Sequence, residues 1–204
     1  MSLLEMKEMS RRKFIQSFTA AAAMGAVFPL LSASAQAATP LSAVEIADLL
    51  WSREEEKVAR DVYITLYKKW RHNTFNNISK SEQQHMDTML LKLTTYGIPD
   101  PVLVPIGAFT NQDLQNMYND LVAKGSVSLI DALRVGCVIE EVDIIDLMKA
   151  IENSTHTDLD TSYQNLMAGS YNHLRSFVIA LKMQGVTYSP LYLNQDLYNS
   201  ILNG

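Results

Sequence analysis

The sequence from residue 42 to residue 72 reads SAVEIADLLWSREEEKVARDVYITLYKKWRH. Its apolar residues recur at steps of three and four, which is the spacing of one face of an α-helix. Ser42 and Glu45 have the spacing of a capping box, in which each side chain accepts a backbone hydrogen bond at the helix start. We therefore predict one long helix from Ser42 to His72, about 45 Å in length.

The chain beyond this helix repeats the same helical signals. We predict further helices from Ser79 to Gly97, from Thr110 to about Lys124, from Ser128 to Glu152 and from Asp158 to Gln184. No segment shows the alternation of a strand flanked by hairpin turns. The tail from Val186 is expected to pack back over these helices. The predicted fold class is therefore all-α: a bundle of four long helices with a short extra helix between the second and the third.

The composition supports one globular domain without disulfides. Of 204 residues, 48% are apolar and 19% are charged, a balance that excludes collagen-like, coiled-coil and disordered chains. A single cysteine, Cys137, cannot form an internal disulfide, so a packed core must stabilise the fold. The formal net charge of -5 argues against a nucleic-acid partner, because phosphate binding needs a basic patch.

Residues 1–37 have the organisation of an export signal. Arg11 and Arg12 lie in the sequence SRRKFI and are followed by an apolar run, residues 18–31, and by the small residues around Ala37. The paired arginines resemble a twin-arginine signal, which implies export of the folded protein by the twin-arginine translocase. We predict cleavage after Ala37, a mature domain of residues 38–204 without a membrane anchor, and a periplasmic or secreted location.

Acids and histidines interrupt the apolar faces of all four predicted long helices. Glu82 and His85 are three residues apart, so one helical turn brings both within reach of one metal ion. Glu56 ends a run of three glutamates, of which we expect only one to face the core. Glu140 and His173 also lie among apolar residues. Because burying an unpaired carboxylate is costly, their presence on four helices together indicates a compensating cation.

Each of these residues has a simpler interpretation when it is taken singly. A Glu-x-x-His pair on a helix is more often solvent-exposed than metal-bound, and a run of glutamates is usually solvated. His173 alone would most often be a hydrogen-bonded histidine within a bundle. His72 and His156 lie near predicted helix ends, where a surface or capping role is the simplest. Only the combination favours a metal centre, since a dimetal site in a helical bundle draws ligands from all four helices.

The motifs resemble those of a known protein family. Three are similar to motifs of rubrerythrin-type ferritin-like proteins: Glu56-x-x-Ala59-Arg60-x-x-Tyr63, Glu82-x-x-His85 and Gly136-x-x-x-Glu140-x-x-Asp143. The stretches 53–57, 81–87, 139–143 and 169–175 more closely resemble an uncharacterised ferritin-like family of bacteria and archaea, known as a domain of unknown function. This resemblance covers residues 41–190 and implies a ferritin-like four-helix bundle.

The resemblance also implies a carboxylate-bridged dimetal site. The positions that match ligands of such a site are Glu56, Glu82, His85, Glu140 and His173. Glu82 and Glu140 would bridge the two ions, Glu56 would be a terminal ligand, and each histidine would supply one nitrogen. Tyr63 would donate a hydrogen bond to these ligands. Oxygen and nitrogen donors in this mixture suit iron or manganese, with zinc as an alternative that lacks redox chemistry.

One position departs from the rubrerythrin pattern. The fourth helix carries Ser170-x-x-His173 where relatives have a second Glu-x-x-His, so one terminal carboxylate is absent. The second ion would then be held less tightly and be more open to water or substrate, or the site would hold a single ion. Glu141 or Asp143 would replace the missing ligand if the third helix were rotated. Cys137 is either a soft ligand or, more simply, a small buried hydrophobe.

The expected function is that of an exported metalloprotein that oxidises Fe(II) or reduces peroxide. Such a protein needs a separate electron donor, because the chain has no Cys-x-x-Cys pair for a further iron site. The alternatives are a metal-storage bundle, which would form a large homo-oligomer, and a structural envelope protein whose metal site has decayed. A third alternative is an interaction module that uses the tyrosine-rich tail.

Overall fold

The computed structural model describes residues 40–204, so the predicted export signal, with Arg11 and Arg12, lies outside the described residues. Within residues 40–204 the chain forms helices and no strand, which confirms the predicted all-α class. The helices are α2 (Ala43–Trp70), α3 (Asn73–Thr95), α4 (Gln112–Gly125), α5 (Leu129–Asn153), α6 (Thr157–Met183) and α7 (Gln195–Asn203). No helix of this part of the chain has the length and apolar character that crossing a membrane requires.

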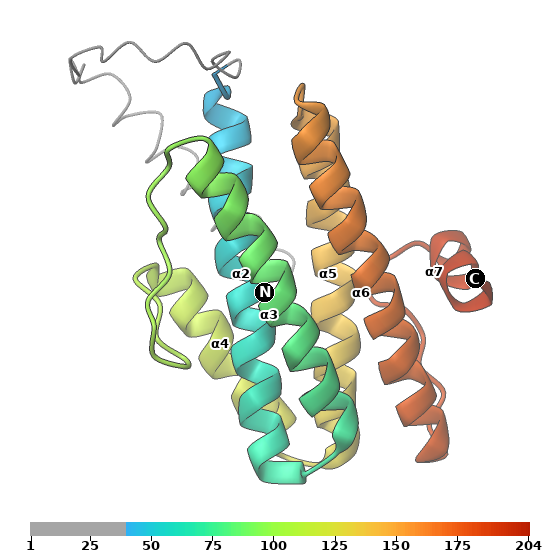
Figure 1. Ribbon diagram of the computed structural model, residues 1–204. Coiled ribbons are helices and arrows are strands. Elements are labelled where there is room, and N and C mark those ends of the chain that lie inside the picture. The colour runs from blue at the N-terminus through green and yellow to red at the C-terminus, as the bar shows by residue number, and fades with distance from the viewer. Residues whose placement is uncertain (1–39) are drawn as a thin grey trace.

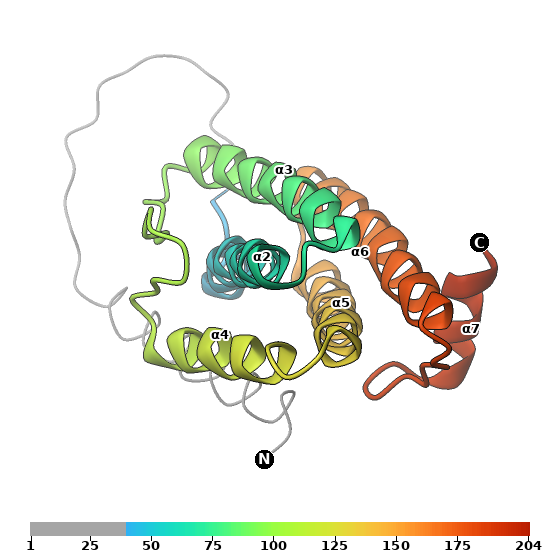
Figure 2. The same ribbon diagram turned by 90° about the horizontal axis from the view of Figure 1, so that it is seen from below.

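The four long helices α2, α3, α5 and α6 form a bundle (Figure 1). Short connections join α2 to α3 and α5 to α6, and the two pairs meet where α2 contacts α5 and α3 contacts α6. The predicted extra helix, α4, packs on the outside of α2 and α5, while α7 lies against the outer side of α6 (Figure 2). As a result α2 is enclosed by α3, α4 and α5.

Two long helices begin at the side-chain caps that the sequence indicates. Ser42 and Glu45 form the predicted capping box of α2, and the Ser128 side chain caps α5. The predicted start of the second long helix at Ser79 is wrong, because α3 begins at Asn73 and Ser79 lies inside it. The Ser79 hydroxyl donates to the carbonyl oxygen of Asn76, a bond available to any serine within a helix. A serine three residues before a glutamate therefore does not by itself mark a helix start.

The apolar core is divided into two clusters by a polar layer. One cluster, which includes Leu49, Met89 and Leu166, lies toward the start of α2, and a larger one, which includes Tyr63 and Phe177, lies toward its end. On each long helix the predicted metal-ligand positions fall between residues of the two clusters. The apolar burial that stabilises the fold thus lies on both sides of the candidate site.

All three glutamates of the run on α2 are buried, so the expectation that only one would face the core is wrong. Glu54, Glu55 and Glu56 are 3%, 4% and 2% exposed. Three consecutive residues point in directions about 100° apart around a helix. The enclosure of α2 by its neighbours leaves none of these directions open to solvent.

Two cations of α2 hold the connection between α3 and α4 over it. The guanidinium of Arg53 forms two hydrogen bonds to the carboxylate of Asp100, at 2.9 and 3.1 Å. The ammonium of Lys57 donates to the carbonyl oxygens of Pro105 and Ala108, each at 3.1 Å. These contacts explain how a helix with so many charged residues can be buried on every side, because each buried cation has oxygen partners.

The tail from Val186 packs against the bundle as predicted, and Glu141 of α5 holds it there. The buried Glu141 carboxylate accepts a hydrogen bond from the Tyr188 hydroxyl at 2.5 Å. It also accepts hydrogen bonds from the consecutive backbone amides of residues 191–193, the shortest at 2.7 Å. Glu141 therefore faces the tail and does not replace the missing carboxylate of the candidate metal site.

We expect the substitution Glu141→Gln to release the tail without unfolding the bundle. A glutamine amide group presents hydrogens to backbone amides that need an acceptor, and an unsatisfied buried donor costs about 1–3 kcal/mol. Hydrogen exchange at the amides of residues 191–193 should accelerate by about tenfold or more. The amides of α2 should keep their protection.

The control is Asp120→Asn, which changes an exposed acid on α4 and should leave exchange unchanged. Equal protection of residues 191–193 in Glu141→Gln and in the unsubstituted protein would show that the carboxylate does not hold the tail.

Candidate metal centre

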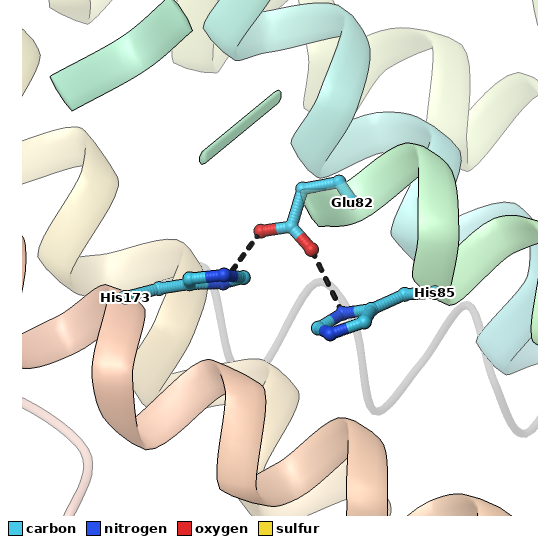
Figure 3. A group of neighbouring side chains, drawn as sticks. All are labelled: Glu82, His85 and His173. Atoms are coloured by element: carbon cyan, nitrogen blue, oxygen red, sulfur yellow. Dashed lines mark ion pairs between the residues drawn. The ribbon is translucent and has the colours of Figure 1, made fainter. Parts of the chain in front are cut away.

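The five side chains predicted as metal ligands lie together in the polar layer of the bundle. They come from all four long helices and none is more than 9% exposed: Glu56 from α2, Glu82 and His85 from α3, Glu140 from α5, and His173 from α6. Figure 3 shows Glu82 between the two histidines. Its Oε1 lies 2.9 Å from Nδ1 of His173 and its Oε2 lies 2.9 Å from Nδ1 of His85.

Each histidine also faces a second carboxylate. Glu56 Oε2 is 3.3 Å from Nδ1 of His85, and Glu140 Oε2 is 3.4 Å from Nδ1 of His173. The donor atoms of Glu82, His85 and His173 lie within 4.8 Å of one another, so this buried group could hold a metal ion. Glu56 Oε1 is buried without a hydrogen-bond partner. A buried carboxylate oxygen in this state is an available ligand for a cation.

The pKa shifts at the site follow from burial and from the alternation of acids and imidazoles. Burial alone would lower the histidine pKa values, but the adjoining carboxylates raise the pKa of His85 to about 12 and that of His173 to about 11. Burial would raise the pKa of Glu82, but the two imidazoles hold it well below its usual range. Burial and Glu82 raise the pKa of Glu140 to about 7. Without a cation the site therefore retains protons, which a bound metal ion would displace.

Tyr63 occupies the position predicted for a hydrogen-bond donor. Its hydroxyl donates to Glu140 Oε1 at 2.5 Å. Burial, together with the charge of Glu140, raises the pKa of Tyr63 well above its usual value. The phenol therefore stays neutral and keeps its proton available to the carboxylate.

Ser170, at the position where the rubrerythrin pattern predicts a carboxylate, binds an acid of the neighbouring helix. The Ser170 hydroxyl donates to Asp143 Oδ2 at 2.6 Å, and both residues are buried. Asp143 lies close enough to the ligand group that its charge, after burial, contributes to the raised pKa of Glu56. Glu140 and Asp143 are three residues apart on α5, so the spacing that places Glu82 beside His85 also places this pair on one side of its helix.

Three other candidate residues have structural roles. Cys137 is buried in the larger apolar cluster, and burial with the nearby Glu141 raises the pKa of its thiol, so it is a packing residue rather than a thiolate ligand. His72 lies at the start of α3 and contacts the Phe75 ring edge-on. His156 lies at the start of α6, with Nδ1 2.7 Å from Glu45.

Two contacts of the imidazoles were not anticipated from the sequence. A Cβ atom at Gly169 of α6 would lie 2.5 Å from Nε2 of His85, so the absence of a side chain there leaves room for the ring. The hydroxyl of Ser81 lies 2.8 Å from Nε2 of His173. Both residues belong to stretches that carry the family resemblance, but no helical spacing rule links residues of α3 to residues of α6.

Comparisons with known proteins agree with the bundle and give no activity. Residues 45–204 match a family described as an uncharacterized protein domain, DUF2202. The uncharacterized protein MJ0754 of Methanocaldococcus jannaschii is 47% identical over 165 residues, which cover 80% of this chain and 89% of that protein. The crystal structure of the hypothetical protein MJ0754 from Methanococcus jannaschii superimposes with a TM-score of 0.81 at 45% identity, covering 84% of this chain and 98% of the other.

We expect the metal-free protein to be most stable near pH 5 and to lose stability as the pH rises to 9. The pKa values of His85 and His173 are raised from 6.5 to about 12 and 11. Their contribution to stability is therefore complete below pH 6.5, falls steadily above it and is fully lost once the pH passes those raised values. The contribution of Glu140, whose pKa is raised from 4.5 to about 7, is lost between these two values. The pKa of Glu82 is lowered, so its contribution to stability is complete above pH 4.5 and is lost only as the pH falls below that value.

Thermal denaturation in the presence of a chelator, between pH 4 and pH 9, measures this dependence. The double variant His85→Gln/His173→Gln should lose most of the slope above pH 7, since it removes the two groups that hold the extra protons. A melting temperature that rises from pH 5 to pH 9 would contradict the assigned shifts.

Proposed function

The chain belongs to the DUF2202 family of uncharacterized protein domains, and we propose that it is a ferritin-like metalloprotein whose buried centre holds two iron or manganese ions and reacts with O2 or peroxide. One observation carries the proposal. The carboxylate of Glu82 lies between Nδ1 of His85 and Nδ1 of His173, and each of these nitrogens faces a further buried carboxylate.

The arrangement of the donor atoms supports the proposal of two divalent cations. Glu82 presents one oxygen to each histidine, which suits a bridging carboxylate. Glu56 and His85 would bind one ion, and His173 would bind the other, with Glu140 as the second bridge. Nitrogen and carboxylate donors without thiolate favour iron or manganese, and zinc would fill the same positions without redox chemistry.

The side chains around the donor atoms orient them and shield them from water. Bound iron or manganese would supply the electron transfer to O2 or peroxide that the side chains lack. Tyr63 orients Glu140 through its hydroxyl, and Ser170 does the same for Asp143. Because all these groups are buried, bulk water is kept from the donors, and the electrostatic attraction for a cation is strengthened.

Export of the folded chain accords with this function. A protein that folds before it passes through the twin-arginine translocase can acquire its metal inside the cell, where the choice of metal is controlled. The proposed location is periplasmic or secreted, and the proposed electron donor is a separate molecule. These proposals rest on Arg11 and Arg12 and on the cysteine content of the sequence.

A second candidate function follows from Ser170. Where a carboxylate would complete the second metal position, α6 supplies a hydroxyl that is already bonded to Asp143. A single ion bound by Glu82, His85 and His173 would then make the protein a metal-binding or storage bundle without turnover. The two candidates differ in the number of ions bound and in their reaction with O2.

Anaerobic loading with Fe(II), followed by addition of O2 or peroxide, tests the proposed function. We expect two iron ions per chain and oxidation of Fe(II) on mixing, recorded by near-ultraviolet absorbance. Glu82→Gln should abolish both, because it replaces one oxygen of the shared carboxylate by a hydrogen-bearing nitrogen that cannot bind a metal ion.

Glu152→Gln removes an exposed acid far from the site along α5 and should behave as the unsubstituted protein. One bound ion without turnover would select the storage function. Neither bound metal nor turnover in the unsubstituted protein would refute both candidates.

A further inference from the structure

The two imidazoles of the site differ in how their outer nitrogens are held. In both rings Nδ1 faces Glu82, and Nε2 points away from the acids. Nε2 of His173 lies 2.8 Å from the hydroxyl of Ser81. Nε2 of His85 instead lies against Gly169, which has no side chain to offer. The hydroxyl contact is therefore specific to one of the two histidines.

A hydroxyl beside Nε2 of a histidine determines which of the two ring nitrogens is free to bind a cation. A neutral imidazole carries one N–H group, and only the other nitrogen has a lone pair for a metal ion. The Ser81 oxygen can accept a hydrogen bond from Nε2–H of His173, which leaves Nδ1 as the lone-pair nitrogen. That nitrogen is the one that faces Glu82 and Glu140. Hydrogen bonding at the outer nitrogen is a general means of fixing the tautomer and orientation of a metal-binding histidine.

The position of Ser81 in the chain strengthens this effect. Ser81 immediately precedes Glu82, so neighbouring residues of α3 contact both nitrogens of His173, which belongs to α6. The ring is thereby held from two sides by one rigid element. A small rotation of His173 about its side-chain bonds would break one contact or the other.

We propose that Ser81 is a positioning residue for His173, which fixes the ring with Nδ1 toward the acids and so increases the affinity of the metal ion that His173 binds. The inference rests on the proposed function. It assigns a role to Ser81 that the family resemblance does not imply, and it makes the two metal positions unequal. The ion bound by His85 does not depend on Ser81.

Titration of the full chain with Co(II), whose visible spectrum reports nitrogen ligation, tests the proposal. Ser81→Ala should weaken one binding step by about 10- to 100-fold and change the spectrum of that ion, while any other step is unchanged. Ser81→Thr keeps the hydroxyl and should restore both affinity and spectrum. The matched control is Ser79→Ala on the same helix, whose hydroxyl bonds only to the backbone of Asn76, and it should titrate as the unsubstituted protein.

Nitrogen-15 spectra of the Zn(II)-loaded protein give a second readout that packing alone would not change. His173 should show a metal-bound Nδ1 and a protonated Nε2. In Ser81→Ala, His173 should show a mixture of this form and the form that carries its proton on Nδ1. If Ser81→Ala retains the folded helical spectrum but has unchanged Co(II) affinity and unchanged histidine signals, the positioning role is refuted and the metal site stands. If the unsubstituted chain binds neither Co(II) nor Zn(II), the proposed function fails and the positioning role fails with it.

Discussion

The carboxylate of Glu82, shared between His85 and His173, is the contact on which the centre of the bundle depends. It joins α3 to α6, two helices that are not consecutive in the chain but contact each other at the site. Without it the polar layer would be a set of buried charges between two apolar clusters, at a cost of several kcal/mol for each uncompensated ion. The alternation of acid and imidazole from Glu56 to Glu140 gives each charge an opposite neighbour.

Helical periodicity explains why much of this site could be predicted from the sequence. Residues three apart share a side of a helix whatever the helix packs against, so Glu82 and His85 were predictable as a pair. Tertiary contacts determine the features that could not be predicted. Glu54 is buried because α2 is enclosed by segments distant in the chain, and the pairing of Arg53 with Asp100 joins residues with no local relationship. The contact between the Ser81 hydroxyl and Nε2 of His173 likewise depends on how α3 and α6 pack together.

The adjacent acids Glu140 and Glu141 show how one helix serves two separate functions. A rotation of about 100° per residue directs Glu140 to the polar layer and Glu141 to the tail. Through Glu141, the amides of residues 191–193 and the Tyr188 hydroxyl therefore fix the orientation of α5 about its own axis on the side of the tail. The Tyr63 hydroxyl fixes the same helix from inside, through Glu140. The docked tail is thus part of what holds a candidate metal ligand in place.

The balance of formal charge in the polar layer accords with the proposed pair of metal ions. Ser170 holds Asp143 of α5 near the proposed ligands, so four carboxylates, those of Glu56, Glu82, Glu140 and Asp143, surround the two imidazoles. Two divalent cations would neutralise four carboxylates while both imidazoles stay neutral, as metal coordination requires. One divalent cation would leave two carboxylates to be neutralised by protons, and the raised pKa values of Glu56 and Glu140 make these two carboxyl groups the sites for them. Asp143 of α5 therefore supplies a fourth buried acid at the level where α6 supplies only the hydroxyl of Ser170.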